Sequence, residues 1–65
     1  DEAITQFRRA VTSAPDSPDL RFHLARAFHA NGQTEKAREA VKRALASDAR
    51  FAEREQAETF LRELE

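Results

Sequence analysis

The sequence predicts an all-α protein, an antiparallel stack of α-hairpins with about four helices. Three observations lead to this prediction. Apolar residues recur at intervals of three and four, as on one face of a helix. Proline, glycine and helix-capping residues mark short breaks between these segments. A shift of 34 residues also aligns the apolar pattern of the first segment with that of the third. The helices are expected at residues 1–14, 18–31, 34–47 and 52–64.

The first expected helix, residues 1–14, has a single apolar stripe. Its members are Ala3, Ile4, Phe7, Ala10, Val11 and Ala14. Asp1 and Glu2 suit the positive end of the helix dipole. The helix has to end before Pro15, because proline disfavours a helical residue ahead of it.

The next two helices have recognisable start and stop signals. Ser17 is the expected N-cap of the second helix, with Pro18 at its first position. Gly32 can adopt the left-handed conformation that ends this helix. Thr34 is then the expected cap of the third helix. Because the turns are short, the helices are expected to pack as antiparallel neighbours.

The second, third and fourth expected helices each have a core stripe. The stripe of the second helix is Leu20, Leu24, Ala27 and Phe28. That of the third is Ala37, Val41, Ala44 and Leu45, and that of the fourth is Ala57, Phe60, Leu61 and Leu64. The other face of the third helix has charges spaced for pairing along the helix, and it is expected to be solvated. Its members are Glu35, Arg38, Glu39, Lys42 and Arg43.

The 34-residue shift pairs small with small and large with large residues. It superposes Ala3 on Ala37, Phe7 on Val41, and Ala10 on Ala44. The same residues, with Leu24-Ala25, Phe28, Gly32, Val11 and Pro15, make the chain resemble the tetratricopeptide repeat family, whose period is about 34 residues. Two positions depart from the family pattern: Arg21 stands in place of a large apolar residue and Ala49 in place of the terminal proline.

The resemblance implies a right-handed stack of helix pairs forming a single domain over residues 1–65. Residues 1–17 would be the second half of a repeat, residues 18–51 a complete repeat, and residues 52–65 a C-terminal capping helix. In the family, the first helices of the repeats line a concave groove that binds peptides or proteins. The expected binding face is therefore on the second helix.

Five residues gather on the side of the second helix opposite its core stripe, and they are the candidate partner-binding residues. They are Asp19, Phe22, His23, Arg26 and His29. Aromatic and arginine side chains are enriched at binding hot spots. Other interpretations are open: Phe22 could cover the preceding helix near Phe7, Arg26 could pair with Asp19, and the two histidines could simply lie at the surface. The histidines are six positions apart, which argues against a shared metal ion.

Composition narrows the function. The net charge of −1 and the interleaving of acidic and basic residues argue against binding of nucleic acid, because a protein that binds nucleic acid normally presents a basic face. No catalytic constellation is visible, Gly32 is the only glycine, and no cofactor is expected, so an enzyme is not predicted. No apolar run is long enough to insert in a membrane. The expected protein is soluble, cytoplasmic or periplasmic, and its high arginine and alanine content suggests a bacterial source.

The predicted function is a protein–protein interaction scaffold that binds a protein or peptide partner on helix 18–31. The alternative is a purely structural C-terminal cap of a longer repeat array. The first residue is not Met, which suggests a piece of a longer chain. Without a preceding helix, Ile4, Phe7 and Val11 are expected to be partly uncovered, so the isolated chain is expected to self-associate, for example as a homodimer through its first helix.

Overall fold

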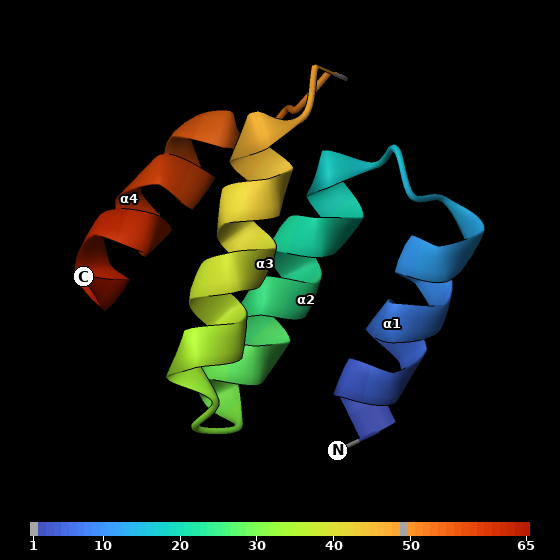
Figure 1. Cartoon of the computed structure of the whole chain (residues 1–65), viewed down its shortest axis with the longest axis horizontal. Coiled ribbons are helices and arrows are strands. Elements are labelled where there is room, and N and C mark those ends of the chain that lie inside the picture. The colour runs from blue at the N-terminus through green and yellow to red at the C-terminus, as the bar shows by residue number, and fades with distance from the viewer. Residues whose placement is uncertain (1, 49) are drawn as a thin grey trace.

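The computed structural model describes residues 2–48 and 50–65 and confirms the all-α fold. Its helices are α1 (Glu2–Ser13), α2 (Pro18–Ala30), α3 (Thr34–Ala46) and α4 (Arg54–Leu64) (Figure 1). The helix ends lie within two residues of the predicted ones wherever both are described. Asp1, expected at the start of the first helix, and Ala49, at the position of the family's terminal proline, lie outside the described residues.

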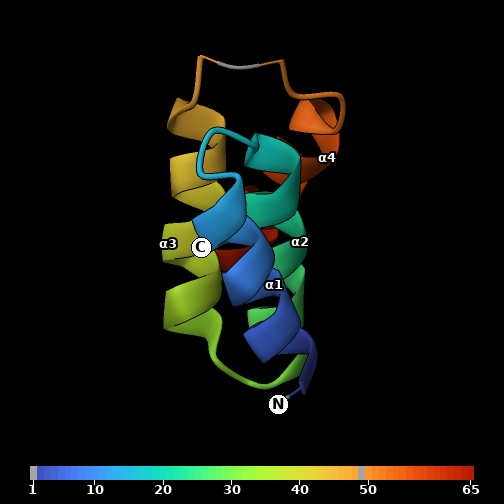
Figure 2. The ribbon, with the colours of Figure 1, turned by 90° about the vertical axis from the view of Figure 1, so that its right-hand side faces the viewer.

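Consecutive helices pack against each other in sequence order. In Figure 1, α1 and α4 lie at the two outer edges, with α2 and α3 between them. Viewed from the side of α1, α2 and the start of α4 lie on one side of the molecule and α3 lies on the other (Figure 2). The molecule is flat, with principal extents of 29 × 28 × 14 Å. It is therefore only about two helices thick.

The turn from α2 to α3 is a Schellman motif. Gly32 has a φ of +79°, in the left-handed region that glycine adopts without strain. Its amide donates to the carbonyl of His29 at 3.0 Å, and the amide of Gln33 donates to the carbonyl of Phe28 at 2.9 Å. These two bonds satisfy two carbonyls in the last turn of α2. The predicted role of Gly32 is thus confirmed.

Of the two predicted N-cap residues, Ser17 is confirmed and Thr34 is not. The Ser17 hydroxyl accepts a hydrogen bond from the amide of Leu20 at 3.4 Å, with Pro18 at the first helical position. The prediction that Thr34 caps α3 is wrong. Thr34 is the first residue of that helix, and Gln33 before it makes no side-chain capping bond. The Schellman motif places Gln33 directly against the end of α2, which brings the start of α3 one residue forward.

The core lies on both sides of α2. Five of its members have no exposed surface: Ala25, Ala37, Val41, Ala44 and Ala57. The other buried apolar residues are Ile4, Phe22, Leu24, Phe28, Ala40 and Phe51. The core stripes of α3 and α4 are as predicted, with Leu45, Phe60, Leu61 and Leu64 partly buried around the centre.

Three expectations about burial are wrong. Ile4 is covered, with 6% exposure, because α1 turns this residue towards α2. Leu20 is only half-buried, whereas Phe22 on the other side of α2 is buried. This helix is central and contacts neighbours on more than one side, so its apolar residues are not confined to a single stripe. Arg38, assigned to a solvated face, is half-buried because it reaches the end of α4.

Candidate functional site

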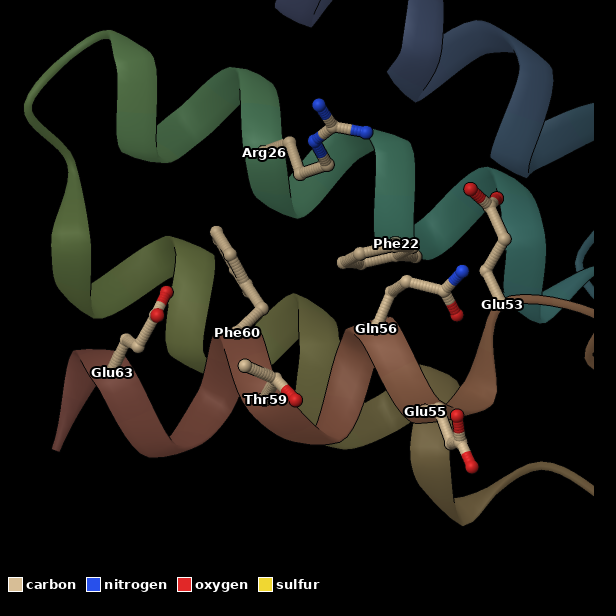
Figure 3. Close-up of a pocket in the computed structure, with 8 residues that line it drawn as sticks. All are labelled: Phe22, Arg26, Glu53, Glu55, Gln56, Thr59, Phe60 and Glu63. Carbon is tan, nitrogen blue, oxygen red and sulfur yellow. The ribbon is translucent and has the colours of Figure 1, made fainter.

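A groove runs between α2 and α4. Its volume is about 520 Å³, and it is open to solvent along one side. Helix α2 contributes Phe22 and Arg26, and the facing wall comes from α4 and the residue before it (Figure 3). The residues of this second wall are Glu53, Glu55, Gln56, Thr59, Phe60 and Glu63. We call this the α2–α4 groove.

Aromatic rings form the floor of the α2–α4 groove. The ring of Phe22 meets the ring of Phe60 edge-on, with centroids 5.7 Å apart and planes at 74°. The ring of Phe51 also meets the ring of Phe22 edge-on, with centroids 6.1 Å apart. Edge-to-face pairs of this kind are a favoured packing of aromatic side chains. The floor is therefore aromatic and apolar.

The prediction that Phe22 lies on the open side of its helix is wrong. Its exposure is 3%, and it is a member of the core. Among the described residues, the aromatic rings that Phe22 meets beyond its own helix are those of Phe51 and Phe60. The reason is that α4 covers this side of α2, which sequence reasoning treated as open.

Arg26 lies over the Phe22 ring. Its guanidinium carbon is 5.8 Å from the ring centroid, a cation–π arrangement. This places the guanidinium at the edge of the groove, where it is exposed to solvent. Within residues 2–48 and 50–65, no ion pair joins Arg26 to Asp19, the partner considered from the sequence.

The other three candidate residues lie around the groove rather than in it. His23 stacks on the ring of Phe7 at 6.0 Å, and its Nε2 lies 3.2 Å from the Glu53 carboxylate. His29 is exposed and meets the edge of the Phe60 ring at 5.6 Å. Asp19, in the first turn of α2, is half-buried and does not line the groove. Only Phe22 and Arg26 of the predicted set therefore meet at one site.

The wall from α4 was missed from the sequence, although the 34-residue period could have revealed it. Adding 34 to four of the five candidate positions gives Glu53, Gln56, Phe60 and Glu63. All four line the groove. Helix α4 thus presents the same positions as α2, in the manner expected of the first helix of a following repeat. The signal was hidden because the residue types at equivalent positions differ.

The charge of the groove is negative. Three carboxylates, those of Glu53, Glu55 and Glu63, line it together with the single guanidinium of Arg26. In the described part of the chain, no cluster of three His, Cys, Asp or Glu side chains could hold a metal ion. None of the four helices described is long and apolar enough to cross a membrane. The groove therefore combines acidic side chains with an aromatic floor.

An antiparallel stack of α-hairpins with a groove between alternate helices defines the chain as a helical-repeat protein. The chain belongs to the tetratricopeptide repeat family, because the family model described as "Tetratricopeptide repeat" matches residues 1–59. The resemblance seen in the sequence is thereby confirmed. Comparisons with curated proteins and with solved structures give no match.

Proposed function

We propose that this chain is a non-catalytic scaffold that binds a segment of a partner protein in the α2–α4 groove. Tetratricopeptide repeats generally serve protein–protein interactions, which supports the general class. The observation that carries the specific proposal is the repetition of lining positions. Helices α2 and α4 both direct residues of one repeat register into a single groove with an aromatic floor.

The charges suggest what the partner segment contains. Arg26 alone, as a guanidinium, would favour an acidic ligand group. In the groove Arg26 is outnumbered by three carboxylates. Charge complementarity therefore favours a segment with lysine or arginine on either side of one apolar side chain. The apolar group would lie on the Phe22–Phe60 floor, and Arg26 would donate to a carbonyl of the bound segment.

Titration of the full chain with a labelled Lys-Leu-Lys-type peptide, followed by fluorescence anisotropy, tests this proposal. Gln56→Ala together with Glu63→Gln changes two exposed lining residues without touching the core. The expected result is binding weakened by about fivefold or more. Glu58→Gln is the matched control, since Glu58 is exposed on α4 but does not line the groove. Unchanged affinity in a folded double variant would refute the assignment of the groove.

A structural role for α4 is the second candidate function, and one observation favours it. The positions 34 residues after Leu24 and Phe28, both buried, are Glu58 and Arg62, both exposed. A terminal repeat with a polar outer face protects a repeat array from solvent. We assign residues 1–17 to half a repeat, 18–51 to a full repeat, and 52–65 to a cap. A chain ending at Phe51 should aggregate or lose helicity. A soluble and fully helical truncation would contradict the cap.

Self-association through α1 is a further part of this proposal. Phe7 and Val11 are only partly buried against the core, although Ile4 is covered. A second copy would bury their remaining apolar surface. Sedimentation over a concentration series should show a dimer that Val11→Glu weakens and that Thr12→Glu, on the exposed side of α1, does not. A monomer at every concentration would exclude it.

A further inference from the structure

A second hollow, of about 350 Å³, lies between α1, α2 and α3, and α4 takes no part in it. Helix α2 contributes Arg21, Leu24 and Phe28 to it. At 100° per residue, these positions are about 150° around the helix from Phe22 and Arg26. The hollow therefore opens on the other face of the molecule from the α2–α4 groove. We call it the α1–α3 hollow.

Cations surround the α1–α3 hollow. Arg8 on α1, Arg21 on α2, and Lys36 and Arg43 on α3 all line it. A single carboxylate, that of Glu39, accompanies them. Its nearest oxygen is 3.9 Å from Arg43, and both side chains are largely exposed, so it neutralises little of the local charge. The hollow is therefore positive, although the chain as a whole has a net charge of −1.

The ring of Phe28 fixes two of these cations. The guanidinium carbon of Arg8 lies 5.8 Å from its centroid, and the ammonium of Lys36 lies 5.9 Å from it. The two side chains come from different helices and converge on one buried ring, which is 6% exposed. Cation–π contacts hold the charged groups near the ring while their donors still face solvent. The positive charge is thus concentrated above an apolar floor.

The floor itself is apolar. Leu24, Phe28 and Ala40 are buried and form the base of the hollow. Arg21 is held at the rim, where its Nη2 donates to the carbonyl of Pro15 at 3.3 Å. A ligand that fits must therefore combine negative groups with at least one apolar group. A bare anion would use the rim and leave the floor uncovered.

We propose that the α1–α3 hollow is a second docking site, for an acidic segment of a partner protein. The segment would have carboxylates on either side of one apolar side chain. The carboxylates would meet Arg8, Lys36 and Arg43, and the apolar side chain would lie on Leu24 and Ala40. Charge complementarity to the cationic rim identifies this occupant.

Nucleic acid fits this hollow less well than an acidic peptide. Nucleic-acid surfaces neutralise a run of phosphates with many cations, and their affinity depends steeply on salt. Here four cations surround one small hollow that also contains Glu39. The chain elsewhere is acidic, with five glutamates and two arginines among residues 53–65. A long polyanion would meet this repulsive charge, whereas a short acidic segment would not.

Fluorescence anisotropy on the full chain tests the proposal with a labelled Asp-Glu-Leu-Glu-Asp peptide. A Lys-Lys-Leu-Lys-Lys peptide and a single-stranded oligothymidylate serve as comparison probes. Of the three probes, the acidic peptide is expected to bind the hollow most tightly. Its affinity should fall as the salt concentration rises, because the contacts are exposed. Arg8→Gln, Lys36→Gln and Arg43→Gln should each weaken it by about two- to fivefold. The triple variant should weaken it by more than about tenfold.

Two control variants separate this site from the α2–α4 groove. Arg50→Gln removes an exposed arginine outside the hollow, and Glu63→Gln changes the groove. Neither should weaken binding of the acidic peptide. In the wild-type chain, amide resonances of Leu24 and Ala40 should shift on titration. Unchanged affinity in the folded triple variant, shifts confined to α4, or tighter binding of the oligothymidylate at the same residues would each overturn the proposal.

Discussion

Arg38 and Arg54 join α3 to α4 at opposite ends of the pair. Arg38, near the start of α3, donates from Nη2 to the carbonyl of Leu64 at the end of α4, at 3.0 Å. Arg54, at the start of α4, donates from Nη1 and Nη2 to the carbonyls of Leu45 and Ser47 at the end of α3, both at 3.2 Å. Each guanidinium thus satisfies carbonyls at the end of the neighbouring helix, where the dipole favours a cation.

We call these contacts of Arg38 and Arg54 between α3 and α4 the clamp, and Arg54→Met tests it. Methionine keeps an apolar side chain but removes both charge-assisted hydrogen bonds, together with the guanidinium that lies 5.7 Å from the centre of the Phe51 ring. The free energy of unfolding should fall by about 1–2 kcal/mol, since such bonds stabilise more than neutral ones. Urea unfolding followed by circular dichroism measures it. Arg62→Met is the control, because Arg62 is exposed and its guanidinium donates to the hydroxyl of Thr59 on its own helix. Equal losses in both variants would contradict the clamp.

Phe22→Ala tests whether this residue belongs to the core. The buried ring contacts Phe51 and Phe60, so its removal should cost about 3–5 kcal/mol. A domain of this size has little more stability than that, and the variant should be largely unfolded at 25 °C. Phe7→Ala, at a partly buried position, should cost clearly less. Thermal unfolding with near-native stability in Phe22→Ala would show that the ring serves recognition only.

Gly32→Ala isolates the cost of a left-handed backbone. Apart from its two chain neighbours, no described residue has an atom within 4 Å of the place where its Cβ would be, so the substitution causes no collision. The φ of +79° alone should lower the free energy of unfolding by about 1–2 kcal/mol. Gly32→Asn should cost less, because asparagine tolerates this conformation better. The midpoint of urea unfolding gives both values. If Gly32→Asn were less stable than Gly32→Ala, the left-handed backbone would not be the cause of the loss.

Glu58→Leu combined with Arg62→Phe tests the polar outer face of α4. These changes restore the residue classes found 34 residues earlier, at Leu24 and Phe28. The new apolar face should cause the chain to self-associate, and light scattering should detect oligomers whose size increases with protein concentration. Lys42→Leu with Ala46→Phe places the same residue types, four apart, on the exposed side of α3. If both pairs associate equally, general hydrophobicity would be the cause.

Most of the fold could be predicted from the sequence, because it depends on local signals. The spacing of Ala37, Val41 and Ala44 predicted the buried side of α3, and Gly32 predicted the turn before it. The site could be predicted only in part. A helical period shows which residues share a face, but it does not show what covers that face. Phe22 was therefore placed among the candidate partner-binding residues, although it is buried against residues of α4 and the segment before it.

Interactions between segments that are distant in the chain could not be predicted from the sequence either. Arg38 and Leu64 are 26 positions apart, and no period connects them. The two hollows likewise depend on packing, since Arg8 and Lys36 meet only because both helices flank the ring of Phe28. The sequence shows interleaved charges, but folding sorts them into a negative groove and a positive hollow.

The flat shape of the molecule has a consequence for its unfolding. With a shortest extent of 14 Å, nearly every core side chain lies one layer from water, and Val41 is the largest that is wholly shielded. Little new surface is therefore exposed when the chain unfolds. Since the urea dependence of stability scales with that surface, its slope should lie near or below the lower end of about 1–3 kcal/mol per molar. Unfolding transitions of this chain will be broad.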